Sequence, residues 1–240
     1  MNWSLILPTR ERTEKLANML ESVKETSADP ANVEMLVAFD LDDNETAAWI
    51  GESDPMAHCP EPGVLVARGA KFFACQRSEN FSKEYYNMLC RHATGRYVFA
   101  LNDDTRFVTP GWDGMAAEAL DAARAKWKDG CVFGRCRDGY GALFACFPIL
   151  SREAIDLQGH FFHEGFKAWG ADIHLHRVWA ACHRVVDLPF RVEHVSHHTG
   201  LDEAPDEVHL RMKALSERGY AHATTAPEAA RIARLLRGQS

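Results

Sequence analysis

The stretch YVFALNDDTRFVTPGW (Tyr97–Trp112) decides the fold, because mostly apolar residues run directly into Asn102, Asp103 and Asp104. A short apolar run that ends in polar residues is typical of a buried strand. Asn and Asp are favoured in turns, where their side chains bond nearby backbone groups, so a plain turn is one interpretation. Adjacent carboxylates repel each other unless a cation or hydrogen-bond donors offset the charge. A site where a metal cation binds together with a diphosphate is therefore the second interpretation.

The first hundred residues alternate between short apolar runs and amphipathic stretches. We expect strands over 3–7, 33–39, 63–68 and 96–101, and helices over 13–27 and 82–95. Thr13 is the expected N-cap of the first helix, and Gly95 the expected C-cap of the second. This alternation predicts an α/β fold with a mixed, mostly parallel sheet and right-handed crossovers.

Polar residues cluster where these expected strands end. Thr9 and Arg10 follow the first strand, an acidic cluster from Asp40 to Asp43 follows the second, and Asn102–Asp104 follows the fourth. Ligands bind beyond the carboxyl ends of the strands in open α/β sheets. We therefore expect three loops to face one crevice.

The second half continues with a helix over 113–126, two antiparallel strands within 131–151 and a short helix whose N-cap is Ser151. A further helix is expected to begin near Asp172, followed by one or two strands within 183–200. Two helical patterns, 206–219 and 226–238, close the chain. We interpret residues 1–201 as the main domain and residues 202–240 as a helical appendage.

Composition limits the class of protein. The 240 residues are 46% apolar and 25% charged, with a formal net charge of −7, as in a soluble globular protein. This charge gives no global reason to expect nucleic acid as a partner. The seven cysteines have no CxxC spacing, the N-terminus lacks a signal-peptide pattern, and no segment approaches the ~20 apolar residues of a membrane span. We expect reduced core cysteines and a cytoplasmic protein.

Four segments together resemble a known family. SLILPTRERTEKLANMLESV, VEMLVAFDLDDNET, ATGRYVFALNDDTRFVTPGW and WGADIHL, in this order and spacing, resemble nucleotide-sugar glycosyltransferases of the GT-A fold, of the family 2 type. The resemblance covers roughly residues 3 to 200. It implies a Rossmann-like nucleotide-diphospho-sugar transferase domain, a nucleotide-sugar donor with UDP favoured over GDP, and a divalent cation, Mn²⁺ or Mg²⁺.

The resemblance also implies roles for the strand-end residues. Thr9 and Arg10 would lie beside the nucleotide, and Asp40, with Asp42 as the neighbouring candidate, would contact the base or ribose. Asp103 would sit near the ribose.

Further roles concern the metal and the acceptor. Asp104 would hold the metal, and a late histidine, His194, His197 or His198, would reach back to it. Asp172 in WGADIHL would be the catalytic base, which takes the proton from an acceptor hydroxyl in an inverting transfer. If Asp172 is instead a solvent-facing N-cap, Glu164 is the alternative base.

Aromatic and basic residues give weaker signals. Trp169 is a candidate for stacking on an acceptor sugar, whereas Trp112 is expected in the core. Lys71, Arg77 and Lys83 follow the third expected strand and would meet a diphosphate only if they face the crevice.

Two other functions fit parts of the sequence. The motif begins with Asn102 rather than Asp, which suits a GT-A-like module that binds a nucleotide or glycan without turnover. The expected base segment also departs from the family pattern, with Ala171-Asp172 rather than Glu-Asp. The histidines within 160–198 suit a zinc hydrolase, although His160-x-x-His163 lacks the His-Glu-x-x-His order of helical zinc proteases. The acceptor is open, and the C-terminal helices would cover it, form a homodimer or dock a partner.

Overall fold

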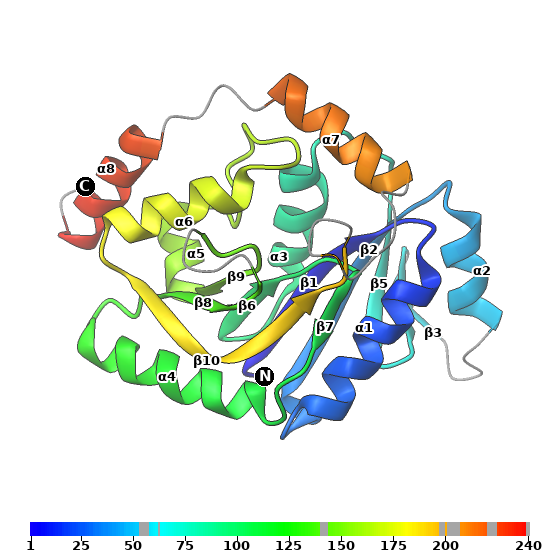
Figure 1. Ribbon diagram of the computed structural model, residues 1–240, viewed down its shortest axis with the longest axis horizontal. Helices are drawn as coiled ribbons and strands as arrows, with labels where there is room; N and C mark the ends of the chain where they lie inside the picture. Colours follow the sequence, from blue (N-terminus) through cyan, green and yellow to red (C-terminus); the bar gives the residue numbers. More distant parts are fainter. Residues whose placement is uncertain are drawn as a thin grey trace.

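The structure is a computed structural model, and it describes residues 1–52, 58–61, 63–139, 144–196, 200, 207–219 and 225–238. The strands of these residues form one mixed sheet in the order β3-β4-β5-β2-β1-β6-β9-β8-β10-β7 (Figure 1). Their bounds are β1 Trp3–Thr9, β2 Val33–Asp40, β3 His58–Glu61, β4 Val64–Ala67, β5 Ala70–Cys75, β6 Tyr97–Ala100, β7 Thr105–Phe107, β8 Phe133–Arg137, β9 Pro148–Ser151 and β10 Val185–His194.

The helices alternate with these strands as the apolar periodicity predicts. They are α1 Thr13–Thr26, η1 Pro30–Asn32, α2 Asn44–Glu52, η2 Ser82–Asn87, α3 Met88–His92, α4 Trp112–Lys126, α5 Arg152–Gln158, α6 Ala171–Ala181, α7 Glu207–Gly219 and α8 Thr225–Leu236. The η2 segment is a π-helix, a rare form that is frequent at functional sites.

The centre of the sheet is parallel. β1 pairs in parallel with both β2 and β6, and β2 pairs in parallel with β5. The carboxyl ends of β1, β2 and β6 therefore meet at one edge, as expected from the polar residues that follow each of them. β8 and β9 are antiparallel, as the sequence predicts.

Two hydrophobic clusters cover the two faces of this sheet. Leu5 and Leu7 of β1 pack in the cluster that includes residues of α1 and α4, and Ile6 packs in the cluster that includes residues of α3, α5, α6 and α8. Burial of both faces explains why β1 and β2 are continuous apolar runs rather than alternating ones. In Figure 1, α4 lies below β10 and α6 above it.

Two local predictions are wrong. Arg12, not Thr13, is the N-cap of α1, and the Thr13 hydroxyl donates to Glu45 instead. α3 ends at His92 with Ala93 as its C-cap, so Gly95 is not the cap. A Cβ at Gly95 would lie 2.6 Å from the Ser4 backbone nitrogen, so glycine is needed there for close approach to β1.

The third strand was also placed incompletely. β4 matches the expected segment, but it is antiparallel to β5, and β5 is the strand that joins the parallel centre beside β2. The short strands β3 and β7 and the helix α2 were not predicted.

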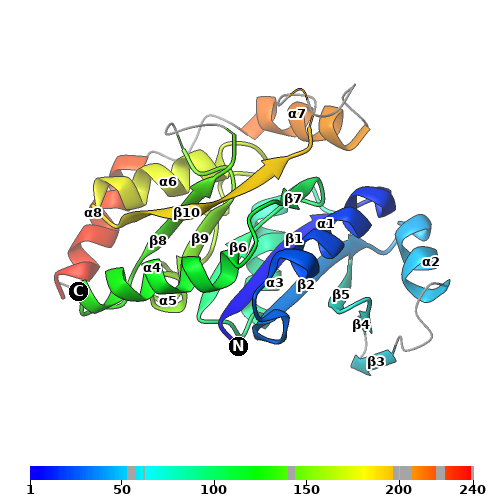
Figure 2. The same cartoon turned by 60° about the horizontal axis from the view of Figure 1, so that its bottom comes forward.

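The C-terminal helices take different places. Ile232 of α8 is buried against the cluster that contains α5 and α6. α7 lies beyond the carboxyl ends of β1 and β2 in both ribbon views (Figures 1 and 2). The boundary at residue 201 stays a prediction.

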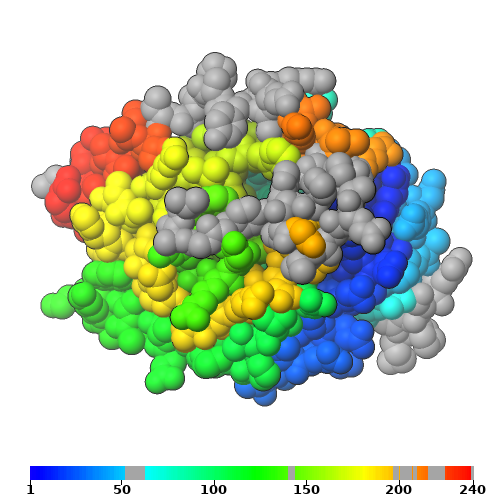
Figure 3. Space-filling model, viewed as in Figure 1, coloured from blue at the N-terminus to red at the C-terminus, as the bar shows by residue number. Residues whose placement is uncertain are grey.

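Figure 3 shows that segments far apart in the sequence lie side by side on this face of the molecule. α4, in green, lies next to β10, in yellow, and next to α1, in blue. The described cysteine side chains are free thiols. In the ranges given above, no helix has the length and apolar character needed to cross a membrane.

Candidate active site

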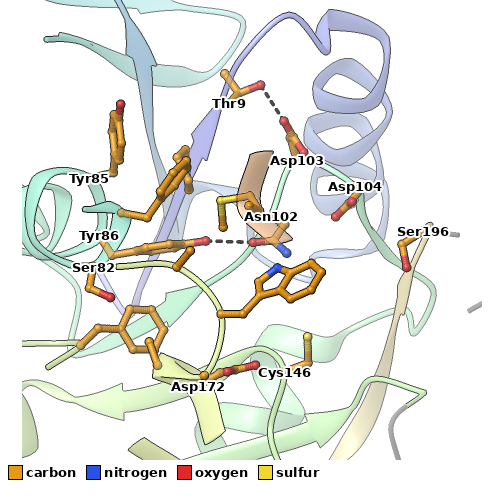
Figure 4. Close-up of a pocket in the computed structure, with 18 of the residues that line it drawn as sticks. Thr9, Ser82, Tyr85, Tyr86, Asn102, Asp103, Asp104, Cys146, Asp172 and Ser196 are labelled. Carbon is orange, nitrogen blue, oxygen red and sulfur yellow. Dashed lines mark hydrogen bonds between the residues drawn. The ribbon is translucent and has the colours of Figure 1, made fainter. Parts of the chain in front are cut away.

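A cavity of about 430 Å³ opens at the carboxyl ends of β1, β2 and β6. Its other walls come from η2, the start of α6, the end of β10 and α7. Figure 4 shows Asp103 and Asp104 on one side of this cavity and Asp172 on the other. The expected crevice is therefore present, and it contains carboxylates on opposite sides.

Asp103 is held by two donors from the loop after β1. The Thr9 hydroxyl donates to Asp103 Oδ2 at 2.9 Å, and Arg12 Nη1 donates to Asp103 Oδ1 at 2.9 Å. Burial raises the pKa of Asp103 to about 6; Arg12 opposes this rise, and the neighbouring charge of Asp104 adds to it. The adjacent carboxylates thus carry a repulsion that an added cation would relieve.

Asp104 lies next to His194. The short strand β7 pairs with the end of β10 in antiparallel register, with Thr105 opposite His194, which brings the imidazole to the acidic end of β6. His194 Nε2 is 3.1 Å from Asp104 Oδ1, and Arg12 Nη1 is 3.7 Å from Asp104 Oδ2. Asp104 Oδ1 is buried and, within the described chain, accepts no hydrogen bond of good geometry.

These two residues fit a hard divalent cation. A carboxylate oxygen and an imidazole nitrogen are both ligands for such ions, and Mg²⁺ and Mn²⁺ commonly rely on one or two protein ligands plus water and substrate phosphates. In the part of the chain that the structure describes, no three His, Cys, Asp or Glu side chains are grouped to hold a metal. A cation here would need its remaining ligands from a bound diphosphate and water. His197 and His198 lie outside the described residues.

Cys146 borders the same part of the cavity. Its Sγ is 3.9 Å from His194 Nδ1. Burial raises the pKa of this thiol well above its usual value, and the charges of Asp172, Asp138 and Asp104 add to the rise. The thiol is therefore protonated at neutral pH and is a poor nucleophile.

Asn102, the departure from the family motif, is fixed by a tyrosine. The Tyr86 hydroxyl lies 2.8 Å from Asn102 Oδ1 and 3.0 Å from the Leu101 carbonyl oxygen (Figure 4). Burial raises the pKa of Tyr86 well above its usual value, so it stays neutral. Asn102 lines the cavity without adding a third negative charge to Asp103 and Asp104.

At the other end of the strand edge, each oxygen of Asp40 accepts a hydrogen bond. Arg10 Nη1 donates to Asp40 Oδ2 at 3.0 Å, and the Tyr85 hydroxyl donates to Asp40 Oδ1. Arg10 also donates to Asp42 at 2.6 Å, but Asp42 is exposed and does not border the cavity. The expected nucleotide residues Thr9, Arg10 and Asp40 thus line the cavity, whereas Asp42 lies behind Arg10.

Asp172 begins α6 but is not its N-cap. Gly170, with φ of 96°, is the cap, and the Asp172 side chain lines the cavity, which excludes the solvent-facing alternative. Asp172 Oδ1 accepts a hydrogen bond from the Ile173 backbone nitrogen at 2.8 Å. Burial raises the pKa of Asp172 to about 6 against the stabilising effect of nearby peptide N–H groups. Glu164, the alternative base, is exposed and does not border the cavity.

Trp169 borders the cavity with 36% of its surface exposed, as a stacking residue would. Trp112 is fully buried in the core, as expected. The basic residues within and after β5 face elsewhere: Lys71 contacts Glu34, Arg77 contacts Asp42, and Lys83 contacts Glu84.

The histidine-rich region divides between two places. His160, His163 and His174 stack near one another, with ring centroids 5.7 and 5.3 Å apart, away from the cavity. His194 is the described histidine that lines the cavity. The described histidines therefore do not supply the three ligands of a catalytic zinc site.

Sequence reasoning missed several cavity residues: Arg12, Phe81, Tyr85, Tyr86, Cys146 and Arg211. The available signal was a pair of adjacent tyrosines within the helical pattern over 82–95. Tyr85 does pack in the core, but its hydroxyl turns to Asp40.

The fold is shared with solved glycosyltransferase structures. TarS from S. aureus in complex with UDP superposes with a TM-score of 0.57 at 13% identity, over 99% of this chain and 71% of the other. The mannosyltransferase PcManGT from Pyrobaculum calidifontis, in complex with GDP-Man and Mn²⁺, gives 0.57 at 14% identity, over 99% and 74%. GalNAc-T7 with UDP, GalNAc and Mn²⁺ gives 0.59 at 12% identity, over 81% of this chain and 44% of the other.

No protein-family profile matches the sequence, and no curated protein matches it either. The chain has the GT-A fold of nucleotide-sugar glycosyltransferases. At these identities the likeness establishes the fold, and the reaction has to be argued from the site.

Proposed function

We propose that this protein is a glycosyltransferase that moves a sugar from a nucleoside-diphosphate-sugar donor to an acceptor hydroxyl. The observation that carries the proposal is the pairing, across one cavity, of Asp104 and His194 with Asp172, whose pKa is raised to about 6. Neighbours of the same fold were solved with UDP, with GDP-Man and with Mn²⁺, which supports a nucleotide-sugar and a divalent cation as ligands.

On the strand side, the protein would bind the diphosphate. Asp104 and His194 would hold a Mn²⁺ or Mg²⁺ ion, which when bound offsets the negative charge that develops on the leaving nucleoside diphosphate. Thr9 and Arg12 keep Asp103 fixed beside it, so this side of the cavity is preorganised.

On the helix side, Asp172 would be the general base. A carboxylate with a pKa near 6 is ionised at neutral pH and still accepts a proton more readily than an ordinary aspartate. Asp172 would take the proton of the acceptor hydroxyl while that oxygen attacks the anomeric carbon, and the bond to the diphosphate breaks, which inverts the configuration. Trp169, beside this helix start, would offer a flat face to the acceptor sugar.

Donor turnover tests this proposal. The full chain is incubated with Mn²⁺ and a panel of UDP- and GDP-sugars, with and without mixed glycan acceptors, and the released nucleoside diphosphate is quantified. We expect release from at least one donor by the wild type, and retained donor binding with greatly reduced release by Asp172→Asn.

A donor that binds without any release by the wild type would instead support the binding module, for which Asn102 at the motif is the favouring feature. Absence of binding by every donor would overturn both functions.

A further inference from the structure

The two ends of the cavity differ in the kind of ligand group they suit. One end contains Asp103, Asp104 and His194 and attracts a cation. The other end contains Phe81 and Tyr85, whose ring centroids are 5.1 Å apart, together with Arg211 from α7. Aromatic and guanidinium faces are surfaces on which a planar base stacks.

Arg211 differs from the other arginines that border the cavity. Arg10 pairs with Asp40 and Asp42, and Arg12 pairs with Asp103. Arg211 Nη2 donates to the Ser78 carbonyl oxygen at 3.2 Å, and its guanidinium lies 5.9 Å from the centre of the Phe81 ring. Within the described residues it makes no ion pair with a carboxylate, so its charge is not offset locally.

The carboxylate at this end, Asp40, is buried and held by two side chains. Both oxygens of Asp40 already accept hydrogen bonds, one from Arg10 and one from the Tyr85 hydroxyl. With 3% of its surface exposed, Asp40 offers little area to a base. Arg211 needs only to exchange a single backbone contact, that with Ser78.

We propose that Arg211 is the base-selecting residue of this cavity, and that it favours uracil, with its O4 carbonyl, and guanine, with its O6 carbonyl, over cytosine and adenine, which have an amino group at those positions. An arginine only donates hydrogen bonds. Guanine offers O6 beside N7, and uracil offers O4, whereas adenine and cytosine place an amino group at the corresponding position. This inference rests on the proposed function and gives α7 a role in the donor site.

The test compares the affinities of four nucleotides for the full chain. GDP, UDP, ADP and CDP are titrated with Mn²⁺ into the wild type, Arg211→Met and Arg211→Lys. Methionine keeps an apolar stem against Phe81 but removes every donor. Lys213→Gln is the matched control, since it removes an exposed positive charge from α7 away from the cavity.

We expect the wild type to bind GDP, UDP or both about tenfold or more tightly than ADP and CDP, because a hydrogen bond from Arg211 to O6 or O4 has no counterpart at an amino group. Arg211→Met should lose that preference, with ADP and CDP affinities unchanged, and Arg211→Lys should keep part of it. Comparison of the GDP and UDP affinities shows whether guanine or uracil is preferred.

Equal losses for all four nucleotides would overturn the inference, because they would mean that Arg211 contacts phosphate or only anchors α7. Unchanged selectivity in Arg211→Met would overturn it as well. If the wild type binds no nucleotide, the proposed function fails first, whereas nucleotide binding without base selectivity removes only the assignment of Arg211.

Discussion

The two sides of the cavity use the same residue type in different electrostatic surroundings. Asp104, on the strand side, has His194 Nε2 at 3.1 Å and Arg12 at 3.7 Å. Asp172, on the helix side, is contacted by the Ile173 peptide N–H and, in the described chain, by no cationic side chain. A carboxylate beside an imidazole and a guanidinium is suited to hold charge, and one beside apolar walls and peptide N–H groups is suited to exchange a proton.

We expect the largest effect from a substitution that removes the Asp104 carboxylate on the strand side of the cavity. Asp104→Asn removes the negative charge that faces His194, so we expect the affinity for UDP or GDP in the presence of Mn²⁺ to fall by about a hundredfold. Asp187→Asn, which alters an exposed aspartate paired with Arg135, is the control. Calorimetry that finds the same metal-dependent affinity in Asp104→Asn would contradict the strand-side assignment.

A substitution of Asp172, on the helix side, should lower turnover without changing nucleotide binding. Asp172→Asn keeps an oxygen for the Ile173 N–H but cannot take a proton, so we expect kcat to fall by about 10²-fold or more with nucleotide affinity unchanged. Timed assays of nucleoside-diphosphate release would measure kcat, and calorimetry would measure the nucleotide affinity. Equal losses in both would show that Asp172 is a binding residue.

The dependence of kcat on pH sharpens the same contrast. A general base works only when it is ionised, so kcat at saturating donor should fall about tenfold per pH unit below the pKa of about 6. The measurement is the rate of diphosphate release between pH 5 and 8. A rate that does not change over this range would exclude a base with this pKa.

A smaller effect is expected on stability. The folded-state pKa of Asp172, about 6, is above its ordinary value of 3.8, so ionised Asp172 destabilises the fold, and this cost grows as pH rises through that interval. Asp172→Asn should therefore raise the free energy of unfolding by about 1 to 2 kcal/mol at pH 8 and have little effect below pH 4. Urea denaturation at the two pH values would measure the difference. A lower free energy of unfolding for Asp172→Asn than for the wild type at pH 8 would contradict this prediction.

The parallel centre and the strand-edge cavity were predictable because their signals are local. Apolar runs locate β1, β2 and β6, and parallel strands bring their polar ends together whatever the rest of the chain does. The position of Asp104 at such an end could therefore be read from the sequence.

Other site features depend on long-range pairing. The position of His194 is set by its register with Thr105 in β7, a three-residue strand too short to leave a pattern. The orientation of Asp172 follows from Gly170 taking the cap, although Asp is itself a favoured cap residue. Arg211 reaches the cavity from a helix 133 residues after Ser78 in the sequence, a contact that no local pattern records.

The most direct test of the account is calorimetry of UDP and GDP binding to the wild type, each with and without Mn²⁺. The account predicts binding of at least one of them that is much tighter with Mn²⁺, because Asp104 and His194 need the diphosphate to complete the ion's ligands. Binding of equal strength without metal would contradict a metal–diphosphate site at Asp104, and no binding of either nucleotide would remove the transferase assignment.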